Sequence, residues 1–244
     1  MPTTTKPCLQ DPHRRPMRRV ISVWLNRFAT DRIRRMQMKK NAISQPNGPL
    51  VTVNAQRGGW SIVAVNKEAA ALGVYPGLTL ANARAVVSGL QSREVAPIAD
   101  RRALNALAES CGRFTPYFAA EGDASGTLAG FYLDISGCEH LFGGEENLLK
   151  KLSGYLEGLN YSHRLAIADT PGAAWGIARF GNSILSNVEP GGQQTALAPL
   201  PVAALRLSPA VVESLQGLGL RTVNELDNMA RGPLTARFGI SVLE

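Results

Sequence analysis

The sequence predicts an α/β protein built around a mixed β-sheet. Short runs rich in β-branched and aromatic residues alternate along the chain with amphipathic segments of helical period. The chain has 244 residues, of which 45% are apolar and 18% charged, enough for one large domain or two to three small ones. No apolar run approaches the roughly 20 residues that a membrane span requires. We therefore expect a soluble, cytoplasmic protein.

The first half of the chain begins with residues 1–17, which contain four prolines and are expected to form a disordered basic arm. The predicted elements that follow are a strand at "RRVISVWL", a basic helix over about 29–40, strands at "LVTVNA" and "WSIVAVN", and short helices at "KEAAALG" and "LANARAVVSGL". The two strands are separated by "QRGG", whose glycine pair is typical of a hairpin turn. The two helices are separated by "VYPG", a turn signal.

The second half continues the alternation with a helix, strand, helix, strand and helix at "DRRALNALAESCGRF", "GFYLDIS", "EENLLKKLSGYLEGL", "YSHRLAIAD" and "PGAAWGIARFG". Pro171 at the first turn and Gly181 near the end suit the last of these helices. Residues 183–197 lack hydrophobic periodicity and are expected to be a linker. Beyond it, "SPAVVESLQGLGLRTVNELDNM" predicts a helix, a "GLGL" hairpin and a second helix from Thr222.

The net charge of +7 is unevenly distributed. Residues 1–40 hold eleven Lys or Arg against Asp11 and Asp31, a local charge of +9 that leaves −2 for the remainder. Such a segment suits a polyanion, most simply nucleic acid, although a solvated tail with one charged helix face fits the charge equally well. The candidate DNA-binding residues here are Arg32, Arg34, Arg35, Lys39 and Lys40.

The "GLGL" hairpin is a second candidate DNA contact. In a helix-hairpin-helix unit, glycines let backbone N–H groups at a helix N-terminus approach a phosphate closely, and a neighbouring arginine adds a charge-assisted contact. A Gly-x-Gly between helices is also an ordinary tight corner, so the motif alone leaves both possibilities open. The candidate residues are Gly217, Gly219, Arg221 and Thr222.

Cysteines and histidines indicate neither a disulfide framework nor a metal cluster, because they are few and scattered. We therefore expect no cofactor. They are Cys8, Cys111, Cys138, His13, His140 and His163.

Four segments together resemble the Y-family (translesion) DNA polymerases, and within them most closely the ImuB-type, polymerase-like group of bacterial damage-induced mutagenesis. The segments are "RRVISVWLNRFATDRIRR", "EAAALGVYPGLTLANARAV", "FYLDISGCEHLFGGEENLL" and "RLAIADTPGAAWGIARFG", and the resemblance covers about residues 18–240. It implies a palm with a mixed sheet, small fingers and a helical thumb of helix-hairpin-helix units. The palm and fingers would span 18–182, with the fingers at about 27–97, and the thumb 198–244. The sequence stops within "FGISVLE", inside a predicted element, so we expect a truncated thumb.

The resemblance also locates departures from an active polymerase. Active members hold two Mg²⁺ ions with carboxylates, in an Asp-x-Asp pattern after the first palm strand and in a Ser-x-Asp-Glu-x-x-x-Asp run. The matching positions are Trp24 and Asn26 in "VISVWLNRF", and Ala129 and Gly130 in "TLAGFYLD". Asp134 is retained, but that aspartate is not a metal ligand. The resemblance therefore implies that the metal site has been lost.

Contacts to the incoming nucleotide also depart from the family pattern. The Tyr-Glu-Ala-Arg run of the fingers matches "KEAA", with Lys67 and Ala70 at the nucleotide-contacting positions. In "ADTPGAAWG", Thr170 and Gly172 replace the palm lysines. A site without its acids and its phosphate clamp is not expected to hold a metal-bound triphosphate.

Two other activities fit parts of the sequence. An active error-prone polymerase would need displaced metal ligands such as Glu121, Asp123 or Asp31, but "EGDASG" is a flexible turn on which rigid two-metal geometry is hard to build. A cyclic-dinucleotide synthase would use "FGGEEN", but this motif leads directly into a helix, where Glu145 and Glu146 are favourable N-terminal charges.

We therefore expect a non-catalytic adaptor of the DNA damage response that binds primer-template DNA without sequence preference. By resemblance, its further partners are a sliding clamp, a RecA-like mutagenesis partner and an error-prone replicative-type polymerase. In that group these partners are reached through regions C-terminal to the core. No membrane role is expected.

Overall fold

A computed structural model describes residues 18–40, 48–121, 130–229 and 232. The predicted basic arm at 1–17 and the end of the predicted thumb lie outside the described residues. None of the described helices is long and apolar enough to cross a membrane. The elements up to the fourth strand are β1 (Val20–Trp24), α1 (Phe28–Lys40), β2 (Leu50–Gln56), β3 (Gly59–Val65), α2 (Lys67–Ala71), α3 (Leu80–Val86) and β4 (Gln91–Glu94).

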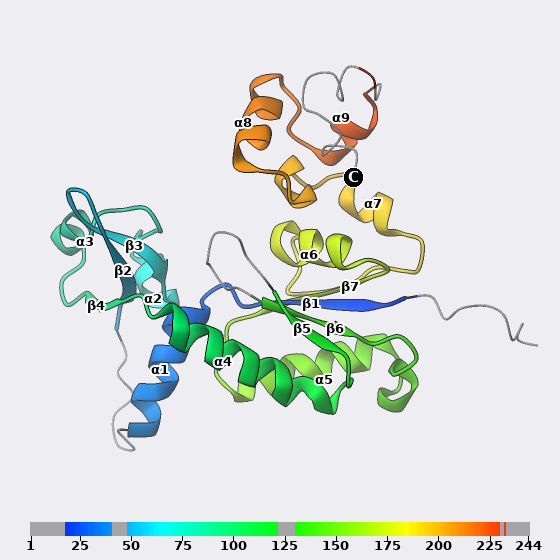
Figure 1. Cartoon of the computed structure of the whole chain (residues 1–244), viewed down its shortest axis with the longest axis horizontal. Helices are drawn as coiled ribbons and strands as arrows, with labels where there is room; N and C mark the ends of the chain where they lie inside the picture. Colours follow the sequence, from blue (N-terminus) through cyan, green and yellow to red (C-terminus); the bar gives the residue numbers. More distant parts are fainter. Residues whose placement is uncertain (1–17, 41–47, 122–129, 230–231, 233–244) are drawn as a thin grey trace, which may run out of the picture.

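The remaining elements complete one layered body and a small C-terminal unit (Figure 1). They are α4 (Pro97–Ser110), η1 (Cys111–Arg113), β5 (Phe118–Ala120), β6 (Gly130–Asp134), η2 (Glu139–Phe142), α5 (Glu145–Gly158), β7 (Arg164–Ala168), α6 (Pro171–Phe180), β8 (Leu185–Asn187), α7 (Gln193–Leu197), η3 (Val202–Leu205), α8 (Pro209–Gly217) and α9 (Val223–Asp227).

The main sheet has the strand order β5-β6-β1-β7-β8, with β1 at its centre. All its pairs are antiparallel except β7 with β8, so the sheet is mixed, as predicted. Helices α4 and α5 cover one face and α6 covers the other (Figure 1). The leucines of α5 recur at helical spacing, so a single face of the helix is apolar and packs against the sheet.

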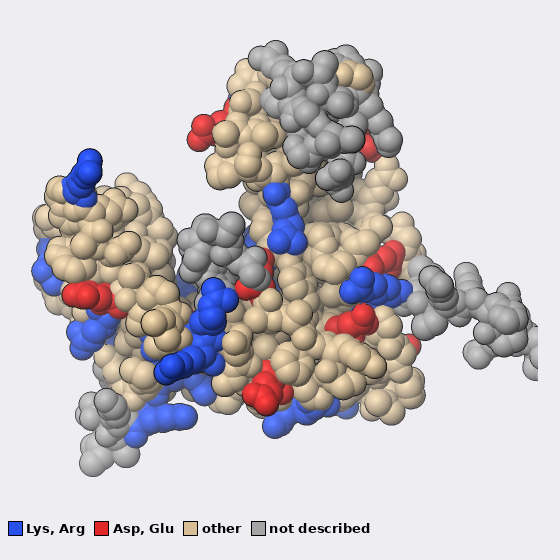
Figure 2. All heavy atoms as spheres, viewed as in Figure 1, with Lys and Arg blue, Asp and Glu red and all other residues tan. Residues whose placement is uncertain are grey.

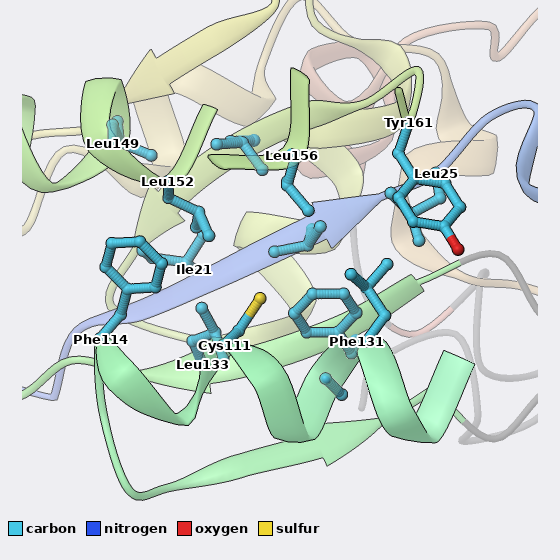
Figure 3. Packing of buried hydrophobic residues seen from close by; sticks show 14 of the residues in the cluster. Ile21, Leu25, Cys111, Phe114, Phe131, Leu133, Leu149, Leu152, Leu156 and Tyr161 are labelled. Carbon is cyan, nitrogen blue, oxygen red and sulfur yellow. The ribbon is translucent and has the colours of Figure 1, made fainter. Parts of the chain in front are cut away.

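The core beneath the sheet is built from residues far apart in the sequence. Ile21 of β1, Phe131 and Leu133 of β6, and Leu152 and Leu156 of α5 pack together, and all are almost fully buried (Figure 3). Burial of such side chains stabilises the fold by about 1.5–3 kcal/mol each relative to exposure. This core lies under the middle of the sheet and leaves the ends of its strands available for a site.

The sequence analysis predicted one sheet, whereas the structure has two. A second sheet, with the order β3-β2-β4, forms a separate small unit with its own core around Val51, Ile62 and Ala83 (Figure 1). Strand β4 was not predicted because "QSRE" is polar and half exposed. Its parallel pairing with β2 is a tertiary contact that leaves no periodic pattern in four residues.

Residues 183–197, predicted as an irregular linker, also differ from expectation. Leu185–Asn187 forms the edge strand β8 beside β7, and Gln193–Leu197 forms α7. Both elements are too short for hydrophobic periodicity to reveal them. The main sheet therefore extends five residues beyond the predicted end of the palm at 182.

Arg19 ties four elements together at the start of β1. Its Nε and Nη2 donate to the two carboxylate oxygens of Glu145 at 2.6 and 2.7 Å, and its Nη1 donates to Asp169 at 2.7 Å. Nη2 also donates to the side chain of Asn187 and the carbonyl of Val188. Hydrogen bonds and attraction from Glu145 and Asp169 raise the pKa of Arg19 despite its burial. Glu145 in "FGGEEN" thus has a structural partner.

We predict that Arg19→Ala lowers the free energy of unfolding by about 3–5 kcal/mol, because it leaves two carboxylates half-buried without their cation. The neighbouring Arg18→Ala is a matched control. Arg18 is 64% exposed and meets Asp134 at 3.5 Å, so its loss should cost no more than about 1 kcal/mol. Chemical denaturation of both variants measures the difference, and equal losses would contradict the prediction.

Candidate functional site

Two of the four positions that the sequence analysis predicted as degenerate catalytic positions meet at one end of the main sheet. Trp24, the last residue of β1, pairs directly with Gly130, the first residue of β6. Trp24 is half-buried and Asn26 is exposed. Ala129 lies outside the described residues. The structure therefore brings Trp24 and Gly130 together in adjacent strands.

Gly130 has no room for a side chain. A Cβ added there would overlap the backbone carbonyl oxygen of Val23 and would lie 3.2 Å from Oε2 of Glu121. Because the first obstacle is backbone in the neighbouring strand, a rotamer change cannot relieve it. A carboxylate at position 130 would require β1 and β6 to move apart.

Glu121 fills the space above this strand pair. Its Oε1 accepts a hydrogen bond from Trp175 Nε1 at 2.5 Å, and its Oε2 accepts one from Arg179 Nη2 at 2.5 Å. Trp175 and Arg179 lie one turn apart on α6, so they project from the same helix face. Both oxygens of the carboxylate are thus engaged by protein donors.

Guanidinium groups and indole rings surround that carboxylate. The Arg179 guanidinium lies 4.4 Å from the Trp175 ring centroid and 5.6 Å from that of Trp24. Arg206, in the turn after η3, lies 5.4 Å from Trp175, and Arg164 lies 5.9 Å from Trp24. We call Trp24, Glu121, Arg164, Trp175, Arg179 and Arg206 the arginine–tryptophan cluster.

The electrostatics of the arginine–tryptophan cluster oppose metal binding. Burial lowers the pKa of Arg179, and the attraction of Glu121 only partly offsets it. Burial and then the Glu121 charge raise the pKa of Tyr132 nearby. Of the cluster's three arginines, only Arg179 is paired with Glu121. The six residues of the cluster carry three guanidinium groups and one carboxylate, so their formal charge is positive, and such a field repels Mg²⁺.

A pocket of about 360 Å³ lies between β1, α1 and the small sheet, and it contains Trp24 and Asn26. Among its described lining residues, Asp100 is the only acid. That carboxylate pairs with Arg32 at 2.5 Å, so its charge is already neutralised. The described lining of this pocket, between palm and fingers, therefore has no unpaired carboxylate that could bind a metal ion.

Of the other two proposed metal ligands, the structure describes only Asp31. Asp31 accepts a hydrogen bond from Ser162 N at 2.7 Å, and burial raises its pKa to about 6. Asp123 lies outside the described residues. In the described part of the chain, no three His, Cys, Asp or Glu side chains converge.

The positions predicted to contact the nucleotide lie on α2 and at the start of α6. Lys67 is exposed at the first turn of α2, and Ala70 follows in the same helix. Thr170 caps α6 by accepting a hydrogen bond from Ala173 N at 3.2 Å, and Gly172 is exposed. Thr170 thus starts the helix that supplies Trp175.

The basic residues of α1 are partly engaged within the protein. Arg32 is 8% exposed and pairs with Asp100, Arg34 donates to the carbonyl of Gly48, and Arg35 lies 4.6 Å from the Tyr161 ring centroid. Lys39 is exposed, and the side chain of Lys40 lies outside the described residues. Figure 2 shows Lys and Arg gathered around α1 and the start of α4. Their DNA contact stays a prediction.

The predicted hairpin lies across the main sheet from α1 (Figure 1). Gly217 ends α8, and Gly219 has φ +86°, a conformation that favours glycine. Thr222 caps α9, and the N–H groups of Arg221 and Thr222 both donate to Glu225, at 2.7 and 2.9 Å. These N–H groups are therefore already satisfied, and a phosphate would meet the exposed Arg221 side chain instead.

Sequence reasoning missed Arg164, Trp175, Arg179 and Arg206, and it considered Glu121 only as a metal ligand. The spacing of Trp175 and Arg179 by four residues in a predicted helix was the only available signal, because it places both on one face. Their partner Glu121 lies more than 50 residues earlier, and that contact depends on the folded sheet.

The arrangement of two mixed sheets with α4, α5 and α6 is the palm and fingers fold of Y-family DNA polymerases. The structure of DinB from Sulfolobus solfataricus matches with a TM-score of 0.68 and 16% identity over 92% of this chain and 64% of that chain. The insertion ternary complex of Dbh DNA polymerase matches with a TM-score of 0.72 and 18% identity over 92% of this chain and 65% of that one. At this identity, the likeness shows the fold.

The chain belongs to the impB/mucB/samB family, whose model matches residues 23–179. Protein ImuB of Caulobacter vibrioides, in strain NA1000 / CB15N and in strain ATCC 19089 / CIP 103742 / CB 15, is 44% identical over 172 residues. The match covers 70% of this chain and 36% of the relative. The chain thus spans about a third of the length of the curated relatives it matches, and the predicted family resemblance is confirmed.

We predict that Gly130→Ala lowers the free energy of unfolding by about 1–3 kcal/mol, because its Cβ would push against the Val23 carbonyl. Gly154→Ala in α5 is the control: nothing lies within 4 Å of its added Cβ, and alanine favours helix by about 0.5–1 kcal/mol. The midpoint temperature of thermal unfolding should therefore be lower for Gly130→Ala than for the parent and slightly higher for Gly154→Ala. A Gly130→Ala protein as stable as the parent would show that the strands can accept a side chain.

Proposed function

We propose that this chain is a non-catalytic, DNA-binding adaptor with a Y-family polymerase fold, acting in the DNA damage response, translesion synthesis and induced mutagenesis. The observation that carries the proposal is the direct pairing of Trp24 with Gly130 at the end of the main sheet. At the positions where active relatives need carboxylates, one side chain is an indole and the other has no space. Two-metal phosphoryl transfer requires acids at that point.

The arginine–tryptophan cluster supports the same proposal. An active polymerase with displaced ligands would have to recruit Glu121, but both its oxygens accept hydrogen bonds from α6. Freeing that carboxylate would leave the Arg179 guanidinium buried and unpaired, which is costly. A binding role is therefore favoured over a displaced metal site.

The DNA contact is proposed at the α8–α9 turn, as part of a helix-hairpin-helix thumb. Arg221 is exposed beside the turn, and Arg206 is exposed in the preceding turn. Both guanidinium groups are available for phosphate oxygens, and such contacts carry no base preference. By family resemblance, an adaptor of this kind would bring a sliding clamp, a RecA-like partner and an error-prone polymerase to damaged DNA.

We predict that the protein does not extend a primer on a template with Mg²⁺ or Mn²⁺, because the metal-binding acids and the nucleotide clamp are both missing. Trp24→Asp should not restore extension, since Gly130 still has no carboxylate and the cluster keeps its positive charge. Both proteins are assayed by primer extension beside an active Y-family polymerase. Template-dependent incorporation that co-purifies with the wild-type chain, and is absent from a mock preparation, would overturn the proposal.

We also predict sequence-independent DNA binding whose affinity falls steeply with salt, with a slope of about −0.9 per phosphate contacted. Arg221→Gln should weaken binding to all sequences alike and reduce the magnitude of that slope by about 1. Arg93→Gln removes the same charge from an exposed position on β4 of the small sheet and serves as the matched control. Fluorescence polarisation with labelled duplexes measures both. If the salt dependence of binding had the same slope for the two variants, the α8–α9 turn would not be part of the DNA-binding site.

A backbone variant tests the geometry of the same turn. Gly219→Val places a β-branched residue at positive φ and should weaken DNA binding without changing the charge. Gly154→Ala, at a helical position of α5 with nothing within 4 Å of the added Cβ, should leave binding unchanged. Equal binding by both variants would show that the turn conformation is not needed.

A further inference from the structure

A groove of about 910 Å³ lies between α1, α4 and the end of α5, on the face of the main sheet opposite α6 (Figure 1). Its floor is apolar and includes Ala103, Ala106 and Leu107 of α4 and Leu159 after α5. Two large apolar side chains line it while open to solvent: Ile98 is 73% exposed and Met36 is 48% exposed. An exposed apolar surface of this kind, framed by charge, is typical of an interaction site.

The rim of the groove is basic. Arg35 and Lys39 come from α1 and Arg102 from α4, and none of the three forms an ion pair with any described residue. Arg32 also lines the groove, but its charge is paired with Asp100. No acid is present among the described lining residues. The groove therefore complements a ligand that is apolar along its centre and acidic along its edges.

The aromatic rings of the groove do not suit nucleic-acid bases. Tyr161 already stacks with Phe28 at a centroid distance of 5.6 Å and carries the Arg35 guanidinium at 4.6 Å. Tyr155 carries the Arg113 guanidinium at 4.5 Å. Binding of single-stranded nucleic acid uses free ring faces for base stacking, and each of these rings already has a partner on at least one face. Aliphatic side chains fit the alanine and leucine floor better.

We propose that this groove docks an acidic amphipathic helix of a partner protein. Two helices, α1 and α4, flank the groove, so an incoming helix can place apolar residues at i, i+3 or i+4, and i+7 on the floor. Its flanking Asp or Glu side chains would then meet Arg35, Lys39 and Arg102. The proposal goes beyond DNA binding, because it assigns to Lys39 and Arg35 a role in binding a partner protein rather than nucleic acid.

The direct test uses a labelled synthetic helical peptide with leucines at that spacing and glutamates on both flanks, added to the full chain. One comparison peptide has lysine in place of every glutamate. A second has the acidic composition but a scrambled leucine spacing. Fluorescence polarisation should show the acidic amphipathic peptide binding at least tenfold more tightly than either. Equal binding of the acidic and lysine peptides, or of the ordered and scrambled peptides, would overturn the proposal.

Variants locate the binding site on the chain. The double variant Lys39→Glu with Arg102→Glu should lower the affinity for the acidic peptide at least tenfold and make the lysine peptide the preferred ligand. An unfolded protein could not show such a reversal of preference. Arg84→Glu combined with Arg93→Glu makes the same net change on the small sheet unit and should have no effect. Ala106→Trp fills the floor without changing charge and should abolish binding. Loss of binding in the Arg84/Arg93 control equal to that in the groove variant would overturn the proposal.

The same proteins are then titrated with duplex DNA. The Arg84/Arg93 control shows how much DNA affinity is lost through the change in net charge alone. We expect the variant Lys39→Glu with Arg102→Glu to bind DNA with at least half of the affinity of that control. If this variant instead loses DNA affinity and keeps peptide affinity, the α1 cations bind nucleic acid and the groove proposal is wrong. If the parent binds the peptide but no DNA, the groove proposal stands and the proposed DNA-binding function fails.

Discussion

The buried Arg19 side chain is the interaction on which the geometry of the main sheet depends. Arg19 starts the central strand and holds the first turn of α5, the end of β7 and the edge strand β8 through Glu145, Asp169 and Asn187. A buried guanidinium is stabilising only when its N–H donors are hydrogen-bonded and its charge is balanced. Here two carboxylates balance the charge, and their oxygens, with those of Asn187 and Val188, accept the hydrogen bonds. This network fixes β1 between its neighbours, so the position of Trp24 at the other end of β1 follows from it.

The large core on the α4–α5 face of the sheet includes neither Trp24 nor Gly130, whereas Trp24 packs against the smaller core around α6. The larger core therefore does not depend on which residue types stand at the site. The buried leucines of α5 and the apolar residues of β1 and β6 lie under the middle of the sheet, whereas Trp24 and Gly130 lie at its end. In the absence of metal, clustered carboxylates repel one another, whereas the Glu121–Arg179 pair neutralises a buried charge. The cluster therefore suits a stable scaffold, and function is decided by the site rather than by the fold.

The sequence predicted the longer elements well because each carries a local signal. The helix at "EENLLKKLSGYLEGL" shows apolar spacing, and the strands at "VISVW" and "GFYLD" show β-branched and aromatic residues bounded by turns. Strands β4, β5 and β8 were missed because three or four residues hold no period, and their pairing partners are distant in sequence. Trp24 and Gly130 were found through family resemblance, but Glu121, Trp175 and Arg179 form a site only after β5 and α6 pack.

Charge patterning shows the same limit and has a functional consequence. The count of basic residues in α1 treats Arg32, Arg35 and Lys39 as equivalent, but the fold neutralises Arg32 with Asp100, places Arg35 on a ring and leaves Lys39 exposed. Four exposed cations lie on opposite sides of the main sheet, with Arg206 and Arg221 on the side of α6 and Lys39 and Arg102 on the side of α4 (Figure 1). The proposed adaptor role requires that two ligands be held at once. Two basic surfaces separated by the sheet can be occupied together, because neither ligand needs the space of the other.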